Sequence, residues 1–310
     1  MALQEHDISW QVLRRIVHEW AGAAAELAEV TPLTGGCINT TVKLTTSKGE
    51  RAVLKFAQHR VTRDLAREAS QLMFLREIGL PVPEVYAVHI ATLYNPDSYL
   101  LMEYVEGFDL AAARRQCTAD EYDDLQRHLA EVISAMHSLT GSKYQRHGGD
   151  DGHFDSWVQF YRHVYDPIWN DVRKSSLLPA RLRKQIDKVH ERLDRLIAHD
   201  DVPRLVHWDI WSTNILAGQD AQGQWRVKAL LDPNCKFAHS EAEIAYMELF
   251  HTITPSFLKA YQSQHKLPEG YQRVRKHIYQ LYPLINHVHL FGQDYVKPLA
   301  GVVETVSGLV

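Results

Sequence analysis

The sequence predicts an α+β protein with two lobes. The smaller N-terminal lobe holds an antiparallel five-stranded sheet and a helix, and the larger C-terminal lobe is mainly helical. Two observations predict this class. Short segments rich in β-branched residues, separated by turn residues, fill much of the chain up to residue 105. After Gly107 the apolar residues instead recur at helical spacing. We therefore expect a boundary between residues 1–104 and residues 105–310.

The N-terminal elements follow from local patterns. Apolar residues at helical spacing predict a first helix over 8–28. A Gly-rich turn within 31–40 then separates two strands of the sheet. A second helix is predicted over 61–78, because Gly79 and Pro81 follow it. The strands predicted after the Gly-rich turn are 40–46, 51–57, 83–90 and 98–107.

The C-terminal lobe begins with a clear helix signal. Residues 118–139 open with "TADE", a capping box with Thr118 as the N-cap and Glu121 at the third helical position. Residues 204–232 interrupt the helical pattern, and they predict a loop, a hairpin and a short apolar strand that ends at an aspartate. Further helices are predicted near 155–172, 179–199, 240–251, 255–264 and 270–292.

The composition excludes several classes of protein. With 45% hydrophobic and 23% charged residues and a net charge of -4, the chain has an ordinary globular composition, and nothing demands nucleic acid or an anionic membrane as a partner. We see no secretory signal and no apolar run of about 18 residues that could span a membrane. The three cysteines are widely spaced, which favours a reducing, cytoplasmic location. The 18 histidines lack the spacing of a zinc site.

Three features of the N-terminal lobe could together form a phosphate-binding site. Gly35 and Gly36 form a turn whose backbone amides could approach a phosphate, although such pairs are most often plain hairpin turns. Lys55 lies in the apolar strand "AVLKF", where it is either an edge-strand lysine or a buried cation. Glu68 on the next helix is either a solvated residue or the anion that keeps Lys55 charged and oriented.

The segment "LVHWDIWSTNIL" (205–216) carries polar side chains between apolar ones. Asp209 and Asn214 lie in this loop, and Asp232 follows the apolar strand of "LLDP". Carboxylate and amide oxygens are the ligands that Mg²⁺ prefers, and a polyphosphate would complete the shell. His207 is predicted to be structural, with a hydrogen bond to backbone near Asp232.

The spacing of these residues is specific. A histidine followed by Asp at +2 and Asn at +7 is the catalytic-loop pattern of eukaryotic-like kinases, and an upstream strand lysine with a helix glutamate completes it. The sequence therefore predicts a protein-kinase-like fold that uses ATP and Mg²⁺. We expect Lys55, Asp209, Asn214 and Asp232 to meet at one site.

The chain also resembles one family within the aminoglycoside phosphotransferase-like kinases, the fructosamine (ketosamine-3-) kinases. "GGCIN" is similar to the glycine loop of that family, and "HWDIWSTN" resembles its "HGDLWSGN". "DPNCKFAHSEAEIAYMELF" resembles "DP…GHREADLAM…LF", and "LYPLINHVHLFGQDY" resembles "LYHLLNHLNLFG.GY". The resemblance runs from about residue 30 to about residue 296, and its last two segments are absent from general kinases.

The resemblance implies phosphorylation of a hydroxyl on a ketose joined to an amine. By position, Asp209 would be the catalytic base, while Asn214 and Asp232 would hold magnesium. Lys55, paired with Glu68, would hold the nucleotide phosphates. The remaining implied residues are the adenine-contacting Glu103, Tyr104 and Val105, the substrate-side candidates Trp211 and Glu241, and Cys37, which in some members of the family is a redox switch.

The chain departs from the family at three places. Trp208 and Thr213 stand where the family has glycines, and the segment "N.IG.TPQ.N" is replaced by "RHGGDDGHFDSWVQFY". Because the replaced segment lies toward the acceptor site in the family, the acceptor is open. An acidic surface around Glu241, Glu243 and Glu248 would suit an amine-bearing molecule, either a ketosamine or an aminoglycoside.

Three other functions remain possible from the sequence. The enzyme could phosphorylate an aminoglycoside, another antibiotic or a simple sugar. It could be a nucleotide-binding pseudokinase scaffold, although every magnesium and base position is filled. It could be a metal-dependent hydrolase, although metal-ligand pairs are absent and Lys55 has no role there. The sequence does not fix the oligomeric state.

Overall fold

The computed structural model describes residues 8–33, 40–57, 63–150, 152–199 and 201–309. These residues form two compact units. The first contains the described residues up to Cys117 together with Thr213–Pro233, and the second contains Thr118–Ser212 and the chain from Asn234. The functional division expected at residues 104/105 assigns nucleotide binding to the first lobe and catalysis to the second, and it stays a prediction.

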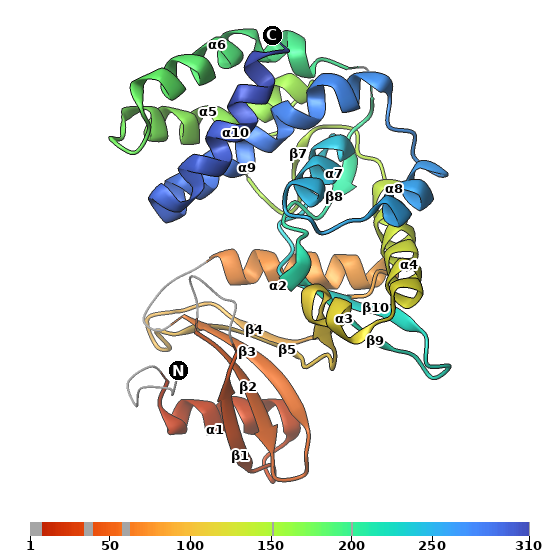
Figure 1. Ribbon diagram of the computed structural model, residues 1–310. Helices are drawn as coiled ribbons and strands as arrows, with labels where there is room; N and C mark the ends of the chain where they lie inside the picture. The colour runs from red at the N-terminus through yellow and green to blue at the C-terminus, as the bar shows by residue number, and fades with distance from the viewer. Residues whose placement is uncertain (1–7, 34–39, 58–62, 151, 200, 310) are drawn as a thin grey trace. The chain divides into compact units, whose positions relative to one another are not determined.

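The first unit is built on an antiparallel sheet. Within the described residues this sheet has five strands in the order β1-β2-β3-β5-β4, and Figure 1 shows it in the red to orange part of the chain. This confirms the expected five-stranded sheet. Its strands are β1 (Leu27–Pro32), β2 (Thr40–Thr46), β3 (Arg51–Ala57), β4 (Val85–His89) and β5 (Ser98–Glu103).

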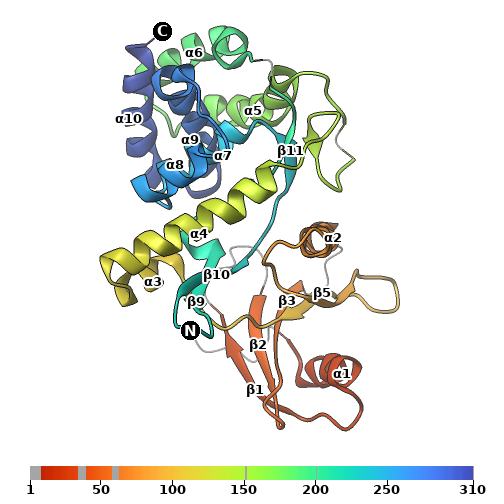
Figure 2. The ribbon, with the colours of Figure 1, turned by 90° about the vertical axis from the view of Figure 1, so that its right-hand side faces the viewer.

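Two helices cover the two faces of this sheet, as Figures 1 and 2 show. Helix α1 (Trp10–Ala21) packs Leu13, Ile16 and Val17 against alternate residues of the strands. Helix α2 (Arg63–Glu77) packs against β4 and β5. The unit also includes a smaller sheet of β6 (Phe108–Asp109), β9 (Ile215–Gln219) and β10 (Trp225–Leu230). Along the chain, α3 (Leu110–Gln116) follows β6, and the 3₁₀ turn Ser212–Asn214 precedes β9.

The second unit is mainly helical, as expected. Helix α4 (Ala119–His137) has the predicted capping box between Thr118 and Glu121 and packs against α8 (Pro255–Gln262). The other helices are α5 (Trp157–Lys174), α6 (Ala180–Ile197), α7 (Ser240–Leu249), α9 (Lys276–Phe291) and α10 (Val296–Ser307), with a π-helical turn at Tyr271–Arg275 and a 3₁₀ turn at Gly292–Tyr295. A small sheet consists of β7 (Gln145–Arg146), β11 (Lys236–Ala238) and β8 (Arg204–Val206), with β11 in the middle.

Aromatic packing fills the centre of the helical unit. Trp157 and Trp169 are fully buried on α5, and Tyr279 on α9 accepts a hydrogen bond from the Trp157 indole at 3.0 Å. The pairing of β11 with β8 sets Phe237 opposite Leu205. This pairing holds the start of the 205–216 segment in the core. Within the described residues, no helix is long and apolar enough to cross a membrane.

Candidate active site

The alternation of side chains along β3 determines where Lys55 points. Leu54 and Phe56 belong to the apolar cluster that packs against α1. Because successive side chains of a strand point to opposite faces, Lys55 points to the face covered by α2. The side chain is buried, with 8% of the residue exposed, so its charge needs partners.

Two carboxylates supply those partners. The Nζ atom of Lys55 lies 2.6 Å from Oε1 of Glu68 on α2 and 2.5 Å from Oδ1 of Asp232. Burial alone would lower the pKa of Lys55, but attraction to Glu68 and then to Asp232, with their hydrogen bonds, raises it above its ordinary value. Lys55 therefore stays charged, and the alternative of a snorkelling edge-strand lysine does not hold.

The same cluster of charges also affects the pKa of the Glu68 carboxyl. Burial raises the pKa of the Glu68 carboxyl; the Lys55 charge opposes this rise, and the negative charge of Asp232 adds to it. The two carboxylates thus compete for one cation. Glu68 is a partly buried partner of Lys55, with 14% of its side chain exposed, and not a solvated helix residue.

The β9–β10 hairpin sets Asn214 and Asp232 at its two ends. Ile215 pairs with Leu230, and the Leu231 N–H donates to the Asn214 carbonyl at 2.9 Å. Asp232 has a φ of 56°, in the left-handed region that few residues other than glycine adopt. Backbone strain of this kind is often found at functional sites.

The donor set of these two residues fits magnesium. Asn214 is buried, and 39% of the Asp232 side chain remains exposed. Among the described residues, no group of three or more His, Cys, Asp or Glu side chains is placed to hold a metal ion. A cation at Asn214 and Asp232 would therefore need phosphate or water oxygens, which is the mode of binding that Mg²⁺ favours.

The expected adenine contacts are Glu103, the last residue of β5, and the next two residues, Tyr104 and Val105. The Glu103 N–H donates to the Glu84 carbonyl at 2.8 Å, and the Glu103 carboxylate accepts from the Glu84 N–H at 3.1 Å. The Tyr104 ring lies beneath the Lys43 ammonium and the Arg51 guanidinium, 5.6 Å and 5.0 Å from its centroid. Strand pairing thus holds Glu103, while the role of Tyr104 and Val105 toward adenine stays a prediction.

Asp209, in the second unit, has a specific hydrogen-bond donor. The Tyr246 hydroxyl on α7 donates to Oδ1 of Asp209 at 2.8 Å. The preceding residue, Trp208, has a φ of 68°, which explains why a glycine suits that position in the resembling family. Its N–H donates to Oε1 of Glu243 at 2.5 Å.

Glu243 connects the loop to the core. It is fully buried, and its Oε2 lies 2.9 Å from Nε2 of His137, whose Nδ1 lies 2.8 Å from the Tyr261 hydroxyl. Burial alone would raise the pKa of Glu243, but the His137 hydrogen bond and charge, and then His207, lower it. His207 is itself fully buried, and its carbonyl accepts from the Asn234 N–H at 3.0 Å.

A row of aromatic rings connects Tyr246 on α7 to His287 on α9 and to Tyr295 beyond it. The Tyr246 ring lies 4.8 Å from Phe250, which lies 5.1 Å from His287, and His287 lies 4.6 Å from Tyr295. Burial lowers the pKa of His287, while its hydrogen bond with the Pro283 carbonyl and the negative charge of Asp209 oppose this shift. Trp211, the first substrate-side candidate, leaves 38% of its surface exposed. The contacts of Tyr246 and Glu243 with the Asp209 loop were not predicted, although both residues lie in the segment "DPNCKFAHSEAEIAYMELF" that resembles the family.

Glu241 is placed differently from the expectation. It is 3% exposed, and both of its oxygens accept from Arg275 at 2.6 Å. Glu248 is likewise bound to Lys276 and Tyr271. Because all three glutamates are occupied by partners inside the unit, the expected acidic surface is wrong. A substrate contact by Glu241 has no support in these contacts.

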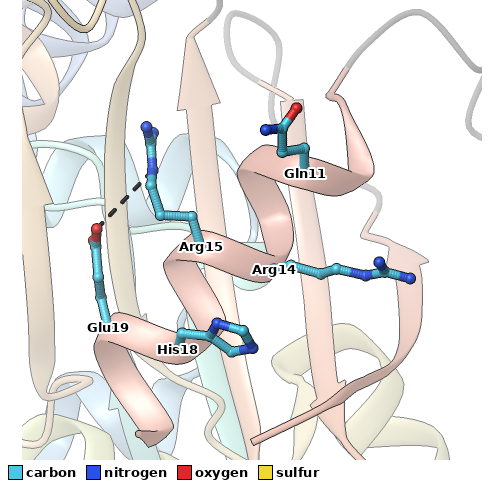
Figure 3. Close-up of a pocket in the computed structure, with 5 residues that line it drawn as sticks. All are labelled: Gln11, Arg14, Arg15, His18 and Glu19. Atoms are coloured by element: carbon cyan, nitrogen blue, oxygen red, sulfur yellow. Dashed lines mark ion pairs between the residues drawn. The ribbon is translucent and has the colours of Figure 1, made fainter. Parts of the chain in front are cut away.

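The glycine-turn residues and a surface hollow on α1 remain to be placed relative to the predicted site. Gly35, Gly36 and Cys37 lie outside the described residues, so their predicted roles stay predictions. A hollow on the solvent side of α1, shown in Figure 3, contains none of the predicted site residues. It is lined by Gln11, Arg14, Arg15, His18 and Glu19.

Comparison with known proteins identifies the family. The family model for fructosamine kinase matches residues 9–307. A protein of Staphylococcus aureus assigned as a ketoamine kinase is 26% identical over 293 residues, which cover 91% of this chain and 94% of the relative.

Two solved structures show the fold. A protein of Thermobifida fusca assigned as a fructosamine-3-kinase superposes with a TM-score of 0.76 at 23% identity, covering 96% of this chain and 99% of the other. The aminoglycoside phosphotransferase APH(4)-Ia, as a thermostable mutant bound to AMP-PNP and hygromycin B, gives 0.67 at 17% identity, covering 96% and 98%. The predicted kinase-like fold is thereby confirmed. The chain belongs to the fructosamine kinase family, and it is a phosphotransferase that acts on a sugar hydroxyl.

Proposed function

We propose that this protein transfers the γ-phosphate of ATP to a hydroxyl of a ketose joined to an amine, in a magnesium-dependent reaction. The observation that carries the proposal is the pairing of the buried Lys55 with both Glu68 and Asp232. A fixed cation beside an oxygen donor for a metal is what a kinase needs to bind polyphosphate. APH(4)-Ia, which has the same fold, binds the ATP analogue AMP-PNP, and this supports the choice of nucleotide.

The first unit is proposed to bind the nucleotide. Lys55 would donate to phosphate oxygens, and its charge is maintained by Glu68. The carboxylate of Asp232 and the amide oxygen of Asn214 would hold magnesium, which when bound neutralises phosphate charge. The backbone of Glu103, Tyr104 and Val105 would bind adenine.

The second unit is proposed to supply the base. Asp209 would accept a hydrogen bond from the acceptor hydroxyl and then its proton, while that oxygen forms a bond to the γ-phosphorus. The bond from the γ-phosphorus to the β,γ-bridging oxygen breaks, and ADP leaves with that electron pair. Positioning and charge neutralisation supply most of the catalysis in such transfers.

The proposed acceptor is a sugar joined to an amine. The S. aureus relative is assigned as a ketoamine kinase and the T. fusca structure as a fructosamine-3-kinase. Trp211 is proposed to contact the sugar, since its exposed ring lies two residues after Asp209. The 3-hydroxyl is the first position to examine. The cytoplasmic location also stays a prediction.

The test is an acceptor screen with labelled ATP. We expect turnover with ketosamines, with the product position read by phosphorus NMR, and little with aminoglycosides or free sugars. Turnover with an aminoglycoside alone would replace the acceptor class. Absence of turnover with every acceptor would favour the pseudokinase alternative.

A variant tests the chemistry separately. Asp209→Asn should lower kcat by at least about a hundredfold, as expected for loss of a general base. The affinity for nucleotide should be kept, because Asp209 belongs to the acceptor side of the reaction. Near-wild-type turnover of this variant would contradict the role of Asp209.

A further inference from the structure

Two residues of α7 act on the segment that carries Asp209. Glu243 and Tyr246 are three positions apart, so they share one face of the helix. Glu243 accepts from the backbone N–H of Trp208, and Tyr246 donates to the side chain of Asp209. The loop is thus held at the backbone by one residue and at the carboxylate by the other.

The hydroxyl of Tyr246 is the part of the side chain that acts on Asp209. It donates to Oδ1 of Asp209 at 2.8 Å. An apolar side chain or a methionine at this position could not donate a hydrogen bond to a carboxylate.

The surroundings of Tyr246 keep it a donor. Burial raises the pKa of the Tyr246 hydroxyl, and the charge of Asp209 and their hydrogen bond raise it further. The phenol thus stays protonated, and able to donate, near neutral pH. Its ring packs on Phe250 at 4.8 Å, which limits the directions in which the hydroxyl can point.

We infer that Tyr246 is a positioning residue for Asp209, which fixes the orientation of the carboxylate toward the acceptor hydroxyl. Oδ1 of Asp209 receives the phenol hydrogen bond, so the carboxylate cannot rotate freely about its last bond. A base held in one orientation spends more of its time aligned with the proton that it accepts. This inference rests on the proposed role of Asp209.

The test compares kcat with KM in Tyr246→Phe, which removes only the hydroxyl. Loss of a hydrogen bond to a charged group corresponds to about a tenfold to a hundredfold effect, which we expect in kcat. The KM values for ATP and the acceptor should stay within about twofold, since binding groups are unchanged. Wild-type kcat in this variant would overturn the inference.

A matched control separates positioning from general damage. Tyr271 also donates its hydroxyl to a carboxylate of α7, that of Glu248, and it is more deeply buried. Tyr271→Phe should keep wild-type kcat even if its melting temperature falls. An equal fall of kcat in both variants would mean that α7 has simply been loosened, and the inference would fail. Tyr246→Met, which also lacks the hydroxyl, should behave as Tyr246→Phe does.

A double-mutant cycle makes the dependence on Asp209 explicit. If Tyr246 acts through Asp209, adding Tyr246→Phe to Asp209→Asn should lower kcat less than about twofold further. The same factor in both backgrounds would show that Tyr246 acts independently, against the inference. Near-wild-type activity of Asp209→Asn alone would overturn the proposed function instead, which keeps the two failures distinct.

Discussion

Lys55 and Asp232 form an ion pair with Nζ and Oδ1 2.5 Å apart, although 177 positions separate them in the sequence. Glu68 binds the same ammonium from α2. One buried cation thus joins a strand, a helix and the end of a hairpin within the first unit. The arrangement explains why a lysine is tolerated in an apolar strand, and it yields predictions about stability as well as activity.

Lys55→Met should both abolish turnover and destabilise the protein. Removing one member of a buried ion pair costs about 3–5 kcal/mol, because the other charge is left without compensation. Adding Glu68→Gln should recover part of the free energy of unfolding but none of the activity. Urea denaturation and steady-state kinetics measure the two effects.

Lys228, on strand β10 of the same unit, provides the control for this pair of variants. Lys228→Met should leave kcat unchanged. If Lys55→Met keeps the nucleotide affinity of the wild type, the phosphate-binding role of Lys55 is refuted.

Asp232→Ala should abolish magnesium-dependent turnover. The variant removes the carboxylate that pairs with Lys55, so it loses one of the two proposed magnesium ligands and one of the two anions that orient the lysine. We expect kcat to fall by more than about a hundredfold, as for other lost charge-stabilising groups. Calorimetric titration with manganese and AMP-PNP gives a second readout, and Asp64→Ala on α2 is the control. An unchanged metal response would show that Asp232 is not a ligand.

Trp208 should tolerate glycine better than alanine. At a φ of 68° an L-residue is strained by about 1 kcal/mol, and glycine relieves this strain, whereas alanine does not. Both variants lose the packing of the indole against Lys236, whose ammonium lies 4.8 Å from the ring centroid, so both should be less stable than the wild type. Trp211, which is not among the residues with positive φ, should show the reverse order. Equal stability of the two Trp208 variants would contradict a strain at this position.

Folding stability should fall as the pH drops below about 6.5, the ordinary pKa of histidine. Burial, followed by the charges of His199 and Arg275, lowers the pKa of His239 well below that value. The unfolded chain therefore binds a proton that the folded chain does not, and stability is lost as pH falls toward the folded pKa. One such group contributes about 1.4 kcal/mol per pH unit in that window.

His239→Gln tests this assignment through the slope of unfolding free energy against pH. The slope between pH values of about 5 and 6.5 should be smaller in the variant than in the wild type. His18→Gln, at an exposed position of α1, should leave the slope unchanged. An unaltered slope in His239→Gln would assign the acid sensitivity to other groups.

Local signals predicted most of the fold. The capping box of Thr118 and Glu121, and the apolar spacing of α4 to α9, are properties of short segments, so the sequence contains them in full. The first helix was predicted too long, because the Ala-rich stretch after Trp20 favours helix. Gly22, with a φ of 95°, ends it, and β1 starts at Leu27 instead. Helix α10 was missed because Pro298 interrupts its pattern, although the first turn of a helix tolerates proline.

The candidate site was likewise predicted in its residues but not in the contacts that depend on packing. Lys55, Glu68 and Asp232 were predicted from residue type and order, and the structure brings these three together. The hydrogen bond of Tyr246 to Asp209 and the buried state of Glu241 depend on how α7 packs, which no local pattern records. The left-handed backbone of Trp208 could have been suspected from the family glycine at that position.

The first unit is not one continuous piece of chain. In its small sheet β6 pairs with β9, and β9 pairs with β10, so two of the three strands come from Thr213–Pro233. Asp232, which pairs with Lys55, lies in the same segment. During synthesis the chain must therefore be made as far as Pro233, including much of the helical unit, before this unit can be completed. A fragment that stops at Cys117 would leave Phe108 and Asp109 without their strand partners in β9 and Lys55 without the carboxylate of Asp232, so it would not form the complete unit.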